Sequence, residues 1–280
     1  MFINANAKIN LTLDVLNKLP NGYHSVSMIM QEISLCDKIE INTNNSGKIN
    51  LKVLNMDLPC DEGNIAYRAA KIFLDKINSD NGCEITIEKH IPVCAGLGGG
   101  SADGAAVLKG LNMVYGYPLK TDELLDLGLS LGADVPFCIM GKTCHAKGVG
   151  EVLTSFESKL NAYVALIKPD ADISTPKAYK DIDALKYEHL QVDKAITALK
   201  MGDKASLCKY GANVFEYVCM PLHPEIEKIK NHFLSCGSFF SMMSGSGPTV
   251  FGLFENPEDA KKAVNSYNGI CLSKHVCEFV

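Results

Sequence analysis

Four of the five residues from Gly96 to Gly100 are glycine, and this run constrains the fold more than any other feature of the 280-residue chain. Apolar residues at helical spacing follow it, through Ala106, Leu111 and Val114. The pattern predicts a loop that enters the N-terminus of a helix, where backbone N–H groups lack partners and the helix dipole is positive. Such a junction binds anions, so we predict a phosphate-binding loop; a tight turn that only lets the helix pack closely is the alternative. The candidate residues of this loop are Pro92, Val93, Cys94, Ala95, Gly96, Leu97, Gly98, Gly99, Gly100, Ser101 and Ala102.

The loop matches neither of the two familiar nucleotide-binding patterns. A P-loop carries a lysine and then a serine or threonine after its last glycine, whereas Ser101 and Ala102 follow here. The dinucleotide-binding pattern counted from Gly96 requires glycine where Ser101 stands. Arg68 is the only arginine, which excludes a clamp of several guanidinium groups. The charge of a bound phosphate must therefore be met by backbone amides, a metal ion or a lysine from elsewhere in the fold.

Lys8 is the candidate for that lysine. It lies in a segment that alternates apolar and polar residues, so Asn10 shares its face of the expected strand. Together they could point toward one site, although spacing alone favours a solvated lysine on an edge strand. Asp134 follows a predicted helix and precedes Pro136. It could act as a base toward a substrate hydroxyl, or serve as an ordinary turn residue.

The first part of the chain is expected to be rich in strands. Alternating patterns predict strands at residues 3–16 and 26–41, joined by a polar turn at residues 21–24, and short strands at 49–53 and 85–87. Helical spacing predicts helices at residues 65–77 and between an N-cap at Thr121 and a stop at Gly132.

The pattern of expected strands and helices changes after Glu151. We expect a strand at residues 163–167, helical segments to about residue 234, strands at 238–243 and 249–254 around a glycine-rich turn, a helix from about residue 256 and a strand at 271–279. A soft boundary near residue 155 predicts two domains, residues 1–155 and 156–280.

Charge and cysteine content argue against several classes of protein. The chain has 27 Lys and Arg against 32 Asp and Glu, and its net charge of −5 argues against nonspecific nucleic-acid binding. The sequence shows no leader pattern and no window of about 18 apolar residues, so no membrane span is expected. Eleven cysteines scatter from Cys36 to Cys277 without a CxxC pair. We expect mostly buried, reduced thiols in a cytoplasmic protein, with a zinc site as the alternative.

Six motifs in one order span nearly the whole chain. They are Ala7-Lys8-Ile9-Asn10-Leu11, Leu19-Pro20-Asn21-Gly22-Tyr23-His24, the loop from Pro92 to Ala102, Gly132-Ala133-Asp134-Val135-Pro136-Phe137, Gly148-Val149-Gly150-Glu151 and Ser244-Gly245-Ser246-Gly247-Pro248-Thr249. Together they resemble the GHMP superfamily of small-molecule kinases, named for galactokinase, homoserine kinase, mevalonate kinase and phosphomevalonate kinase. The glycine loop and the last motif are shared across the superfamily. The Gly-Tyr-His turn and the triple glycine before serine resemble one member family, the 4-diphosphocytidyl-2-C-methyl-D-erythritol kinases.

The resemblance implies an α+β fold with the two-domain GHMP kinase architecture. Its N-terminal domain would be ribosomal-protein-S5-domain-2-like, of β/α type, and would bind ATP; its C-terminal domain would be ferredoxin-like, of α/β type. The implied enzyme is an ATP-dependent phosphotransferase with an alcohol acceptor. It would phosphorylate the tertiary 2-hydroxyl of 4-diphosphocytidyl-2-C-methyl-D-erythritol, giving the 2-phosphate and ADP, in the non-mevalonate (MEP) route to isoprenoid precursors.

Two catalytic roles also follow from the resemblance. The family's catalytic aspartate and lysine fall on Asp134 and Lys8. Asp134 would accept the hydroxyl proton, while Lys8 would orient it and stabilise charge on the transferring group. ATP and Mg²⁺ are implied. Many relatives carry a second serine where this chain has Ala102, so it stays open whether Ser101 contacts the Mg²⁺ or phosphates and water hold it.

The remaining roles concern the substrate. The family's cytidine pocket falls on Tyr23, His24 and Tyr179, where a flat base can stack, and Asn10 would lie near the methylerythritol hydroxyls. Taken alone, the Tyr23-His24 turn would be a solvent-exposed hairpin tip. The second glycine motif could close the phosphate site or merely turn a hairpin, and Gly148 and Gly150 could serve only a close approach of strands. The residues of the second glycine motif are Ser244, Gly245, Ser246 and Gly247.

Three alternative functions stay open from the sequence. One is another GHMP kinase acting on mevalonate, homoserine or a sugar, and the second is a noncatalytic nucleotide-binding regulator. The third is a nucleic-acid-binding β/α module, which the acidic balance and the single arginine oppose. We expect a small-molecule substrate, no nucleic-acid or membrane partner, and a monomer or homodimer.

Overall fold

The computed structural model describes residues 1–280, which divide into two compact units that interleave in sequence. The first unit comprises Met1–Ala7, Cys36–Val93 and Gly98–Gly141; the second comprises Lys8–Leu35, Cys94–Leu97 and Lys142–Val280. Strands β1 (Phe2–Lys18) and β2 (His24–Asn44) contribute to both. The two domains predicted on either side of residue 155 are each continuous in sequence, whereas each of these units combines three segments of the chain. The boundary near residue 155 stays a prediction.

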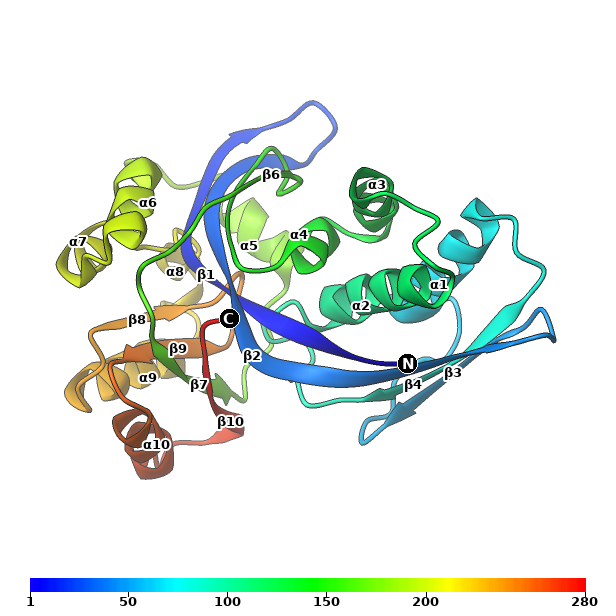
Figure 1. Ribbon diagram of the computed structural model, residues 1–280. Coiled ribbons are helices and arrows are strands. Elements are labelled where there is room, and N and C mark those ends of the chain that lie inside the picture. Colours follow the sequence, from blue (N-terminus) through cyan, green and yellow to red (C-terminus); the bar gives the residue numbers. More distant parts are fainter. The chain divides into compact units, whose positions relative to one another are not determined.

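In the first unit, helices cover a small sheet. The later half of β2 pairs antiparallel with β4 (Gly82–Glu88), and β3 (Ile49–Leu54) pairs parallel with β4. Helices α1 (Ile65–Lys76), α2 (Gly99–Val114), α3 (Thr121–Leu131) and α4 (Val135–Met140) pack against one another. Figure 1 shows α1 and α2 lying over these strands.

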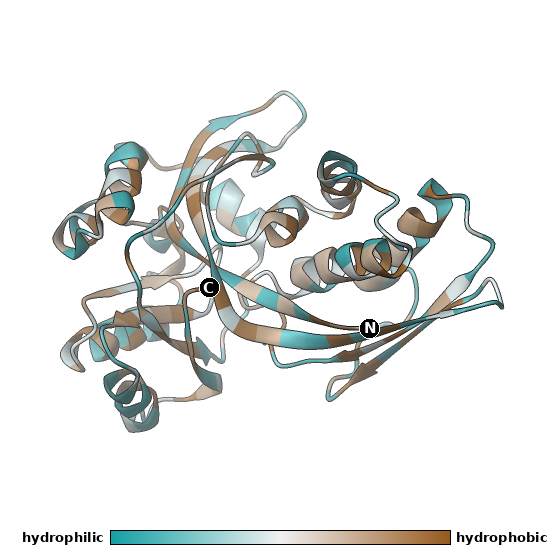
Figure 2. Cartoon of the chain, viewed as in Figure 1, coloured by the Kyte–Doolittle hydropathy of each residue, from teal (hydrophilic) through white to brown (hydrophobic).

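Alternating side chains build the core of this unit. Ile39 and Ile41 of β2 lie opposite Ile87 and Ile85 of β4, and all four are buried. Polar residues such as Glu40 alternate with them, as the period of two in a strand requires, and β2 accordingly carries bands of both colours in Figure 2. The helices add apolar side chains from their inner faces, so one hydrophobic layer joins sheet and helices.

The second unit contains a four-stranded antiparallel sheet in the order β10-β7-β9-β8. Its strands are β7 (Tyr163–Pro169), β8 (Phe240–Met243), β9 (Val250–Phe254) and β10 (Cys271–Glu278). Helices α9 (Pro224–Ser235) and α10 (Pro257–Ser266) pack against this sheet. The hairpin of β5 (Thr143–Lys147) and β6 (Val152–Ser155) pairs with the earlier half of β2. Four short helices complete the unit: α5 (Thr175–Ile182), α6 (Val192–Met201), α7 (Lys204–Tyr210) and α8 (Glu216–Cys219).

The expected strands and helices are confirmed, with three corrections. Thr121 is the first residue of α3 and not its N-cap; Lys120 is the N-cap, and its N–H donates to Glu123 Oε2 over 3.1 Å. The short helix α4 was not expected; Asp134 lies in the turn before it and is its N-cap residue. All eleven cysteines are free, but only four are buried, so the expectation of mostly buried thiols is wrong. The buried ones are Cys83, Cys138, Cys144 and Cys219.

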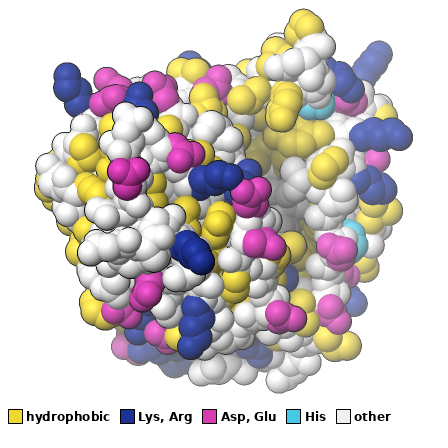
Figure 3. Space-filling view, turned by 90° about the vertical axis from the view of Figure 1, so that its right-hand side faces the viewer, with side chains coloured by type: hydrophobic (Ala, Val, Ile, Leu, Met, Phe, Trp, Pro, Cys, Tyr) yellow, Lys and Arg dark blue, Asp and Glu magenta, His cyan; other side chains and the backbone are white.

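The surface carries both signs of charge. On the face drawn in Figure 3, lysine side chains are interspersed with Asp and Glu rather than gathered in one basic area. None of the helices is both long enough and apolar enough to span a membrane.

The core of the first unit makes a testable prediction about stability. Phe73 on α1 is fully buried and lies 6.1 Å, ring centre to ring centre, from Tyr115. Replacing Phe73 by Ala should lower the free energy of unfolding by about 3–5 kcal/mol, because it removes buried apolar area and leaves a cavity. Urea denaturation would measure this. The matched control Leu185→Ala, at a side chain 44% exposed, should change it by less than about 0.5 kcal/mol; equal losses would contradict the account of the core.

Candidate active site

The glycine-rich loop enters α2 as predicted. Gly98 adopts a left-handed conformation (φ 72°) and precedes the helix, and the carbonyl of Gly98 accepts from the N–H of Ala102 over 2.8 Å. The N–H groups of Gly99, Gly100 and Ser101 lie in the first turn, where the helix offers no carbonyl partner. Gly100 is exposed and the two neighbours are half-buried, so a ligand can reach these donors. The local geometry is that of an anion-binding helix start.

The middle of the loop is fastened to two other segments of the second unit. The N–H of Lys8 in β1 donates to the carbonyl of Leu97 over 3.0 Å, and the Ser244 hydroxyl donates to the carbonyl of Gly96 over 2.9 Å. Gly96 has a φ of 73°, and a Cβ there would lie 2.1 Å from the Ser244 carbonyl oxygen. Only glycine fits, because the obstacle is backbone and cannot rotate away.

The side chains of Lys8 and Asn10, both in β1, lie next to the contact between the glycine loop and the second glycine turn. Both side chains are buried, and Lys8 Nζ donates to Asn10 Oδ1 over 2.8 Å. The amide of Asn10 in turn lies 3.3 Å from the sulfur of Met28. A Cβ on Gly245 would lie 3.4 Å from Lys8 Nζ and 3.2 Å from the Gly96 carbonyl oxygen. A buried cation, an amide and two glycine turns therefore converge, although they are separated by up to about 240 residues in sequence.

The second glycine turn joins β8 to β9 and is held from outside. Gly245 and Gly247 have φ values of 58° and 90°, which favour glycine. The side-chain amide of Asn213 donates to the carbonyls of Met243 (2.9 Å) and Gly245 (2.8 Å). These bonds fix the turn from the side away from the loop. The hydroxyls of Ser246 and Thr175 also pair over 2.6 Å.

Asp134 belongs to the first unit. It is half-buried and is the N-cap residue of α4, where its carbonyl accepts from the N–H of Cys138 over 3.2 Å. Lys109 of α2 donates to the carbonyl of Cys138 over 3.0 Å, which ties α4 to α2. The carboxyl group is thus carried at a helix start, where the dipole stabilises a negative charge.

The expected cytidine residues are partly assembled in the second unit. The rings of His24 and Tyr179 stack, with centres 4.8 Å apart and planes 19° apart, and Tyr179 meets Phe215 edge-on at 4.9 Å. Tyr23 precedes His24 in sequence, lies at the tip of the β1–β2 hairpin and is 65% exposed. The structure therefore provides one packed aromatic pair and one exposed ring that could close on a flat ligand.

Asp183 is a member of this cluster that the sequence did not indicate. One carboxylate oxygen accepts from His24 Nε2 over 2.7 Å, and the other accepts from Lys18 Nζ over 2.9 Å. These partners, Lys18 first, hold the pKa of Asp183 below its usual range. Because a carboxylate can only accept, Nε2 of His24 carries a proton. Asp183 is the C-cap residue of α5, and its place in the sequence gave no signal of this role.

A buried charge cluster behind the loop was also missed. Lys89 lies between the carboxylates of Asp37 and Asp103, with Nζ 2.7 Å from Asp103 Oδ2. All three side chains are almost completely buried in the first unit. Asp37 stands among the alternating residues of β2, where a single polar residue looks like any outward position.

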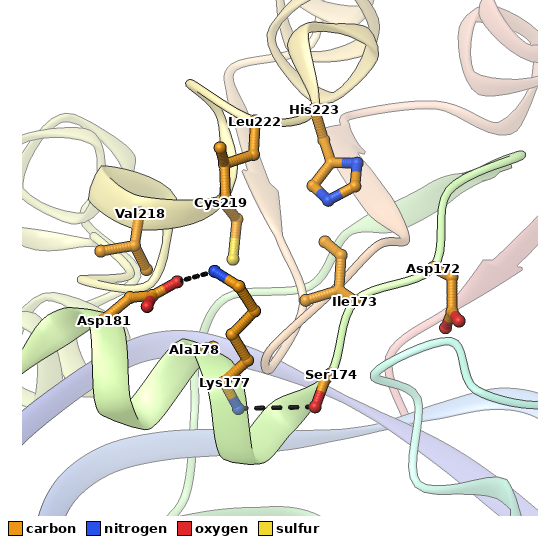
Figure 4. Close-up of a pocket in the computed structure, with 10 residues that line it drawn as sticks. All are labelled: Asp172, Ile173, Ser174, Lys177, Ala178, Asp181, Val218, Cys219, Leu222 and His223. Carbon is orange, nitrogen blue, oxygen red and sulfur yellow. Dashed lines mark hydrogen bonds and ion pairs between the residues drawn. The ribbon is translucent and has the colours of Figure 1, made fainter.

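A small cavity lies between α5 and the segment from Val218 to His223 (Figure 4). Its volume is about 240 Å³, and Lys177, Asp181, Cys219 and His223 are among its lining residues. Lys177 and Asp181 pair with each other, and burial raises the pKa of the Cys219 thiol to about 11. The lysine charge is already compensated and the thiol is protonated at neutral pH, so this cavity offers no reactive group to the chemistry discussed here.

The turn Gly148-Val149-Gly150-Glu151 joins β5 to β6. Glu151 accepts from the N–H of Val149 over 2.6 Å, and a Cβ on Gly148 would lie 2.5 Å from the Glu151 carboxylate. Its glycines serve the turn. Elsewhere, no group of three or more His, Cys, Asp or Glu is placed to hold a metal ion.

Two family models, named relatives and a solved structure match this chain. Residues 64–142 match the family model of the GHMP kinases N terminal domain, and residues 195–270 match that of the GHMP kinases C terminal domain. A 4-diphosphocytidyl-2-C-methyl-D-erythritol kinase of Exiguobacterium sibiricum is 41% identical, over 99% of this chain and 96% of its own. One of Lachnoclostridium phytofermentans is 43% identical, over 95% and 91%. A crystal structure of 4-(cytidine 5'-diphospho)-2C-methyl-D-erythritol kinase superposes with a TM-score of 0.84 at 30% identity, covering 100% of this chain and 99% of that one.

The contact between Gly96 and Ser244 predicts a sharp effect on nucleotide binding. Gly96→Ala should raise the Kd for Mg-ATP at least about tenfold, because the new methyl group must displace the backbone of the loop or of the second glycine turn. Isothermal titration calorimetry would measure it. Gly116→Ala is the matched control, since Gly116 has almost the same φ (74°) but no atom within 4 Å of its Cβ position. If both variants bind Mg-ATP equally well, the close approach does not shape the binding loop.

Proposed function

Because the chain belongs to the family of 4-diphosphocytidyl-2-C-methyl-D-erythritol kinases within the GHMP kinase superfamily, we propose that it transfers the γ-phosphoryl group of ATP to the 2-hydroxyl of 4-diphosphocytidyl-2-C-methyl-D-erythritol. The products would be the 2-phosphate and ADP. The single observation that carries this proposal is the convergence of Lys8, Asn10, Gly96 and Gly245 on the glycine loop, whose next residues in sequence begin α2.

The loop supplies the phosphate site in this proposal. The N–H groups of Gly99, Gly100 and Ser101 would hold phosphate oxygens at the positive end of α2. Lys8 Nζ would supply the cation that the loop lacks, close to the Gly96 carbonyl and the second glycine turn. A positive charge and backbone dipoles fixed before the ligand arrives stabilise the charge of the transferring phosphoryl group without reorganisation.

Asp134 would act as the general base. The carboxylate accepts the proton of the 2-hydroxyl as that oxygen bonds to the γ-phosphorus, and the bond from phosphorus to the β-bridging oxygen breaks to release ADP. The carboxyl group of Asp134 lies at the N-terminus of α4. Asn10, paired with Lys8, would hold the neighbouring hydroxyls of the methylerythritol.

His24, Tyr23 and Tyr179 would hold the cytidine end. Because Nε2 of His24 donates to Asp183, a neutral imidazole leaves Nδ1 as an acceptor for the exocyclic amino group of cytosine. The exposed ring of Tyr23 offers a flat surface for stacking, and Tyr179 offers a second one that is already braced by Phe215. This arrangement favours a nucleobase over the small acids that other GHMP kinases phosphorylate.

Mg²⁺ is expected to accompany ATP. No group of three or more His, Cys, Asp or Glu is placed to bind a metal ion, so the proposal gives the ion to the phosphates and to water. When bound, Mg²⁺ would neutralise part of the phosphate charge. We further expect a cytoplasmic monomer or homodimer whose partner is this small molecule and not a nucleic acid.

An ADP-release assay tests the proposal directly. Purified protein with Mg-ATP should release ADP only when 4-diphosphocytidyl-2-C-methyl-D-erythritol is added. Mevalonate and homoserine serve as control alcohols, and release with either of them instead would favour another GHMP kinase. ATP binding without transfer to any alcohol would favour a noncatalytic regulator.

Replacing the proposed base separates chemistry from binding. Asp134→Asn should lower kcat by about 100- to 10,000-fold, because the amide cannot accept the hydroxyl proton. The Kd for Mg-ATP should stay within about twofold, since the carboxylate acts on the alcohol and not on the nucleotide. Rapid-quench or steady-state ADP measurement gives kcat. A variant with nearly normal kcat would remove Asp134 from the mechanism.

Replacing Asp183 should weaken only the binding of the cytidine end of the substrate. Asp183→Ala should raise the Kd for CDP by about five- to twentyfold, because His24 loses the partner that fixes its orientation. The Kd for Mg-ATP should not change. Asp181→Ala is the matched control: Asp181 is also paired with a lysine near the end of α5, but it faces the separate cavity of Figure 4. Equal CDP affinities in all three proteins would contradict the role of Asp183.

A further inference from the structure

The buried charges behind the phosphate-binding loop are arranged around both of its ends. Asp37 Oδ1 accepts from the N–H groups of His90 (2.5 Å) and Ile91 (2.8 Å), which lie just before the loop. Asp37 Oδ2 pairs with Lys89. On the far side, Lys89 Nζ donates over 2.7 Å to Asp103, in the second turn of the helix that the loop enters. One chain of polar contacts thus connects the segment before the loop with the helix after it.

Apolar packing reinforces this connection. A Cβ on Gly99 would lie 3.0 Å from Ile91 Cγ2 and 3.6 Å from Lys89 Nζ. The segment before the loop therefore lies directly against the first residue of α2. Gly99 is also one of the residues whose N–H would hold phosphate, so a shift of Lys89 or Ile91 would move a proposed ligand donor.

The two carboxyl groups of the cluster are not equivalent. Asp37 is 0% exposed and accepts three hydrogen bonds, so its negative charge is fully satisfied. Asp103 is 4% exposed, receives one bond from Lys89, and leaves Oδ1 buried without a partner. Burial raises the pKa of Asp103 to about 8. One lysine cannot neutralise two buried anions, and Asp103 is the member whose pKa is raised by burial.

We propose that Asp37, Lys89 and Asp103 form a positioning cluster that holds the two ends of the glycine loop in the geometry that binds ATP. Asp37 binds the two N–H groups before the loop, Lys89 is the bridge, and Asp103 supplies the hydrogen-bond acceptor in α2. None of the three touches the nucleotide in this account. The inference rests on the proposed use of the loop for ATP.

Two substitutions at Asp103 test this division of labour. Asp103→Asn keeps the shape and an oxygen that accepts from Lys89, so the Kd for Mg-ATP should rise by less than about threefold. Asp103→Leu removes that acceptor and leaves Lys89 partly unpaired, so the Kd should rise by about tenfold or more. Asp37→Asn should weaken binding at least as much as Asp103→Leu. If that variant does not fold, the two Asp103 variants decide alone.

A matched control separates positioning from general stability. Asn112 lies at the other end of α2, is also buried, and bonds through its side chain to both the N–H and the carbonyl of Leu119. Asn112→Ala should lower the melting temperature about as much as Asp103→Leu but leave the Kd for Mg-ATP within about twofold. Calorimetry with Mg-ATP and, separately, with CDP gives the readout, and the Kd for CDP should stay unchanged in every variant.

The outcomes distinguish this cluster from the kinase assignment. The inference is overturned if Asp103→Leu binds Mg-ATP as tightly as the wild type, or loses no more affinity than Asn112→Ala. It is also overturned if Asp103→Asn loses as much affinity as Asp103→Leu. A wild-type chain that binds Mg-ATP but phosphorylates no cytidylyl alcohol removes the proposed substrate and leaves the binding comparison intact. A wild-type chain that does not bind Mg-ATP overturns both.

Discussion

The close approach of Gly96 to the carbonyl oxygen of Ser244 is the constraint on which the candidate site depends. Two backbones meet where a single Cβ would lie 2.1 Å from an oxygen, and the Ser244 hydroxyl donates to the Gly96 carbonyl across the same contact. Because no side chain separates them, Gly245 is brought close to Lys8 and Asn10. The glycines therefore do more than turn the chain: they let a strand, a loop and a hairpin share one small space.

The proposed site would meet the charge of a phosphate without a group of arginines, because the chain has only one arginine. In the proposed site, backbone amides at the start of α2 would take the place of the guanidinium forks that other phosphate sites use. The two lysines beside the loop, Lys8 and Lys89, are both buried, and each has a polar partner within 2.8 Å. Burial strengthens these interactions and fixes the lysines in one position, which suits a site where charge must be in place before the reaction. In the proposed mechanism Lys8 acts on the transferring group, whereas Lys89 positions the loop.

Much of the fold could be predicted from the sequence, because its signals are local. Alternation of Ile39 and Ile41 with polar neighbours defined β2, and the glycine run followed by apolar periodicity defined the loop and α2. The short helix α4 was missed because six residues containing Pro136 carry no measurable period, although the turn at Asp134 before it was expected. Thr121 was misplaced by one position, since the N-cap preference is weaker than the capping bond that the Lys120 N–H donates to Glu123.

The supporting residues of the site could not be predicted in the same way. Asp37 and Asp183 each occupy positions where a polar residue needs no explanation, one in a strand and one after a helix. Their roles depend on partners 52 and 159 residues away, Lys89 and His24. Such contacts are set by tertiary structure alone. Resemblance to the GHMP kinases identified the residues that would meet the ligands, but not the residues that hold them in place.

The most direct test of the central claim is a crystal structure of the protein with a nonhydrolysable ATP analogue and CDP bound together. The account predicts that the triphosphate lies on the N–H groups of Gly99 to Ser101, that the cytosine lies against Tyr23 and His24, and that Lys8 and Asp134 both face the γ-phosphate. A triphosphate bound away from the glycine loop, or a γ-phosphate out of reach of both side chains, would contradict it.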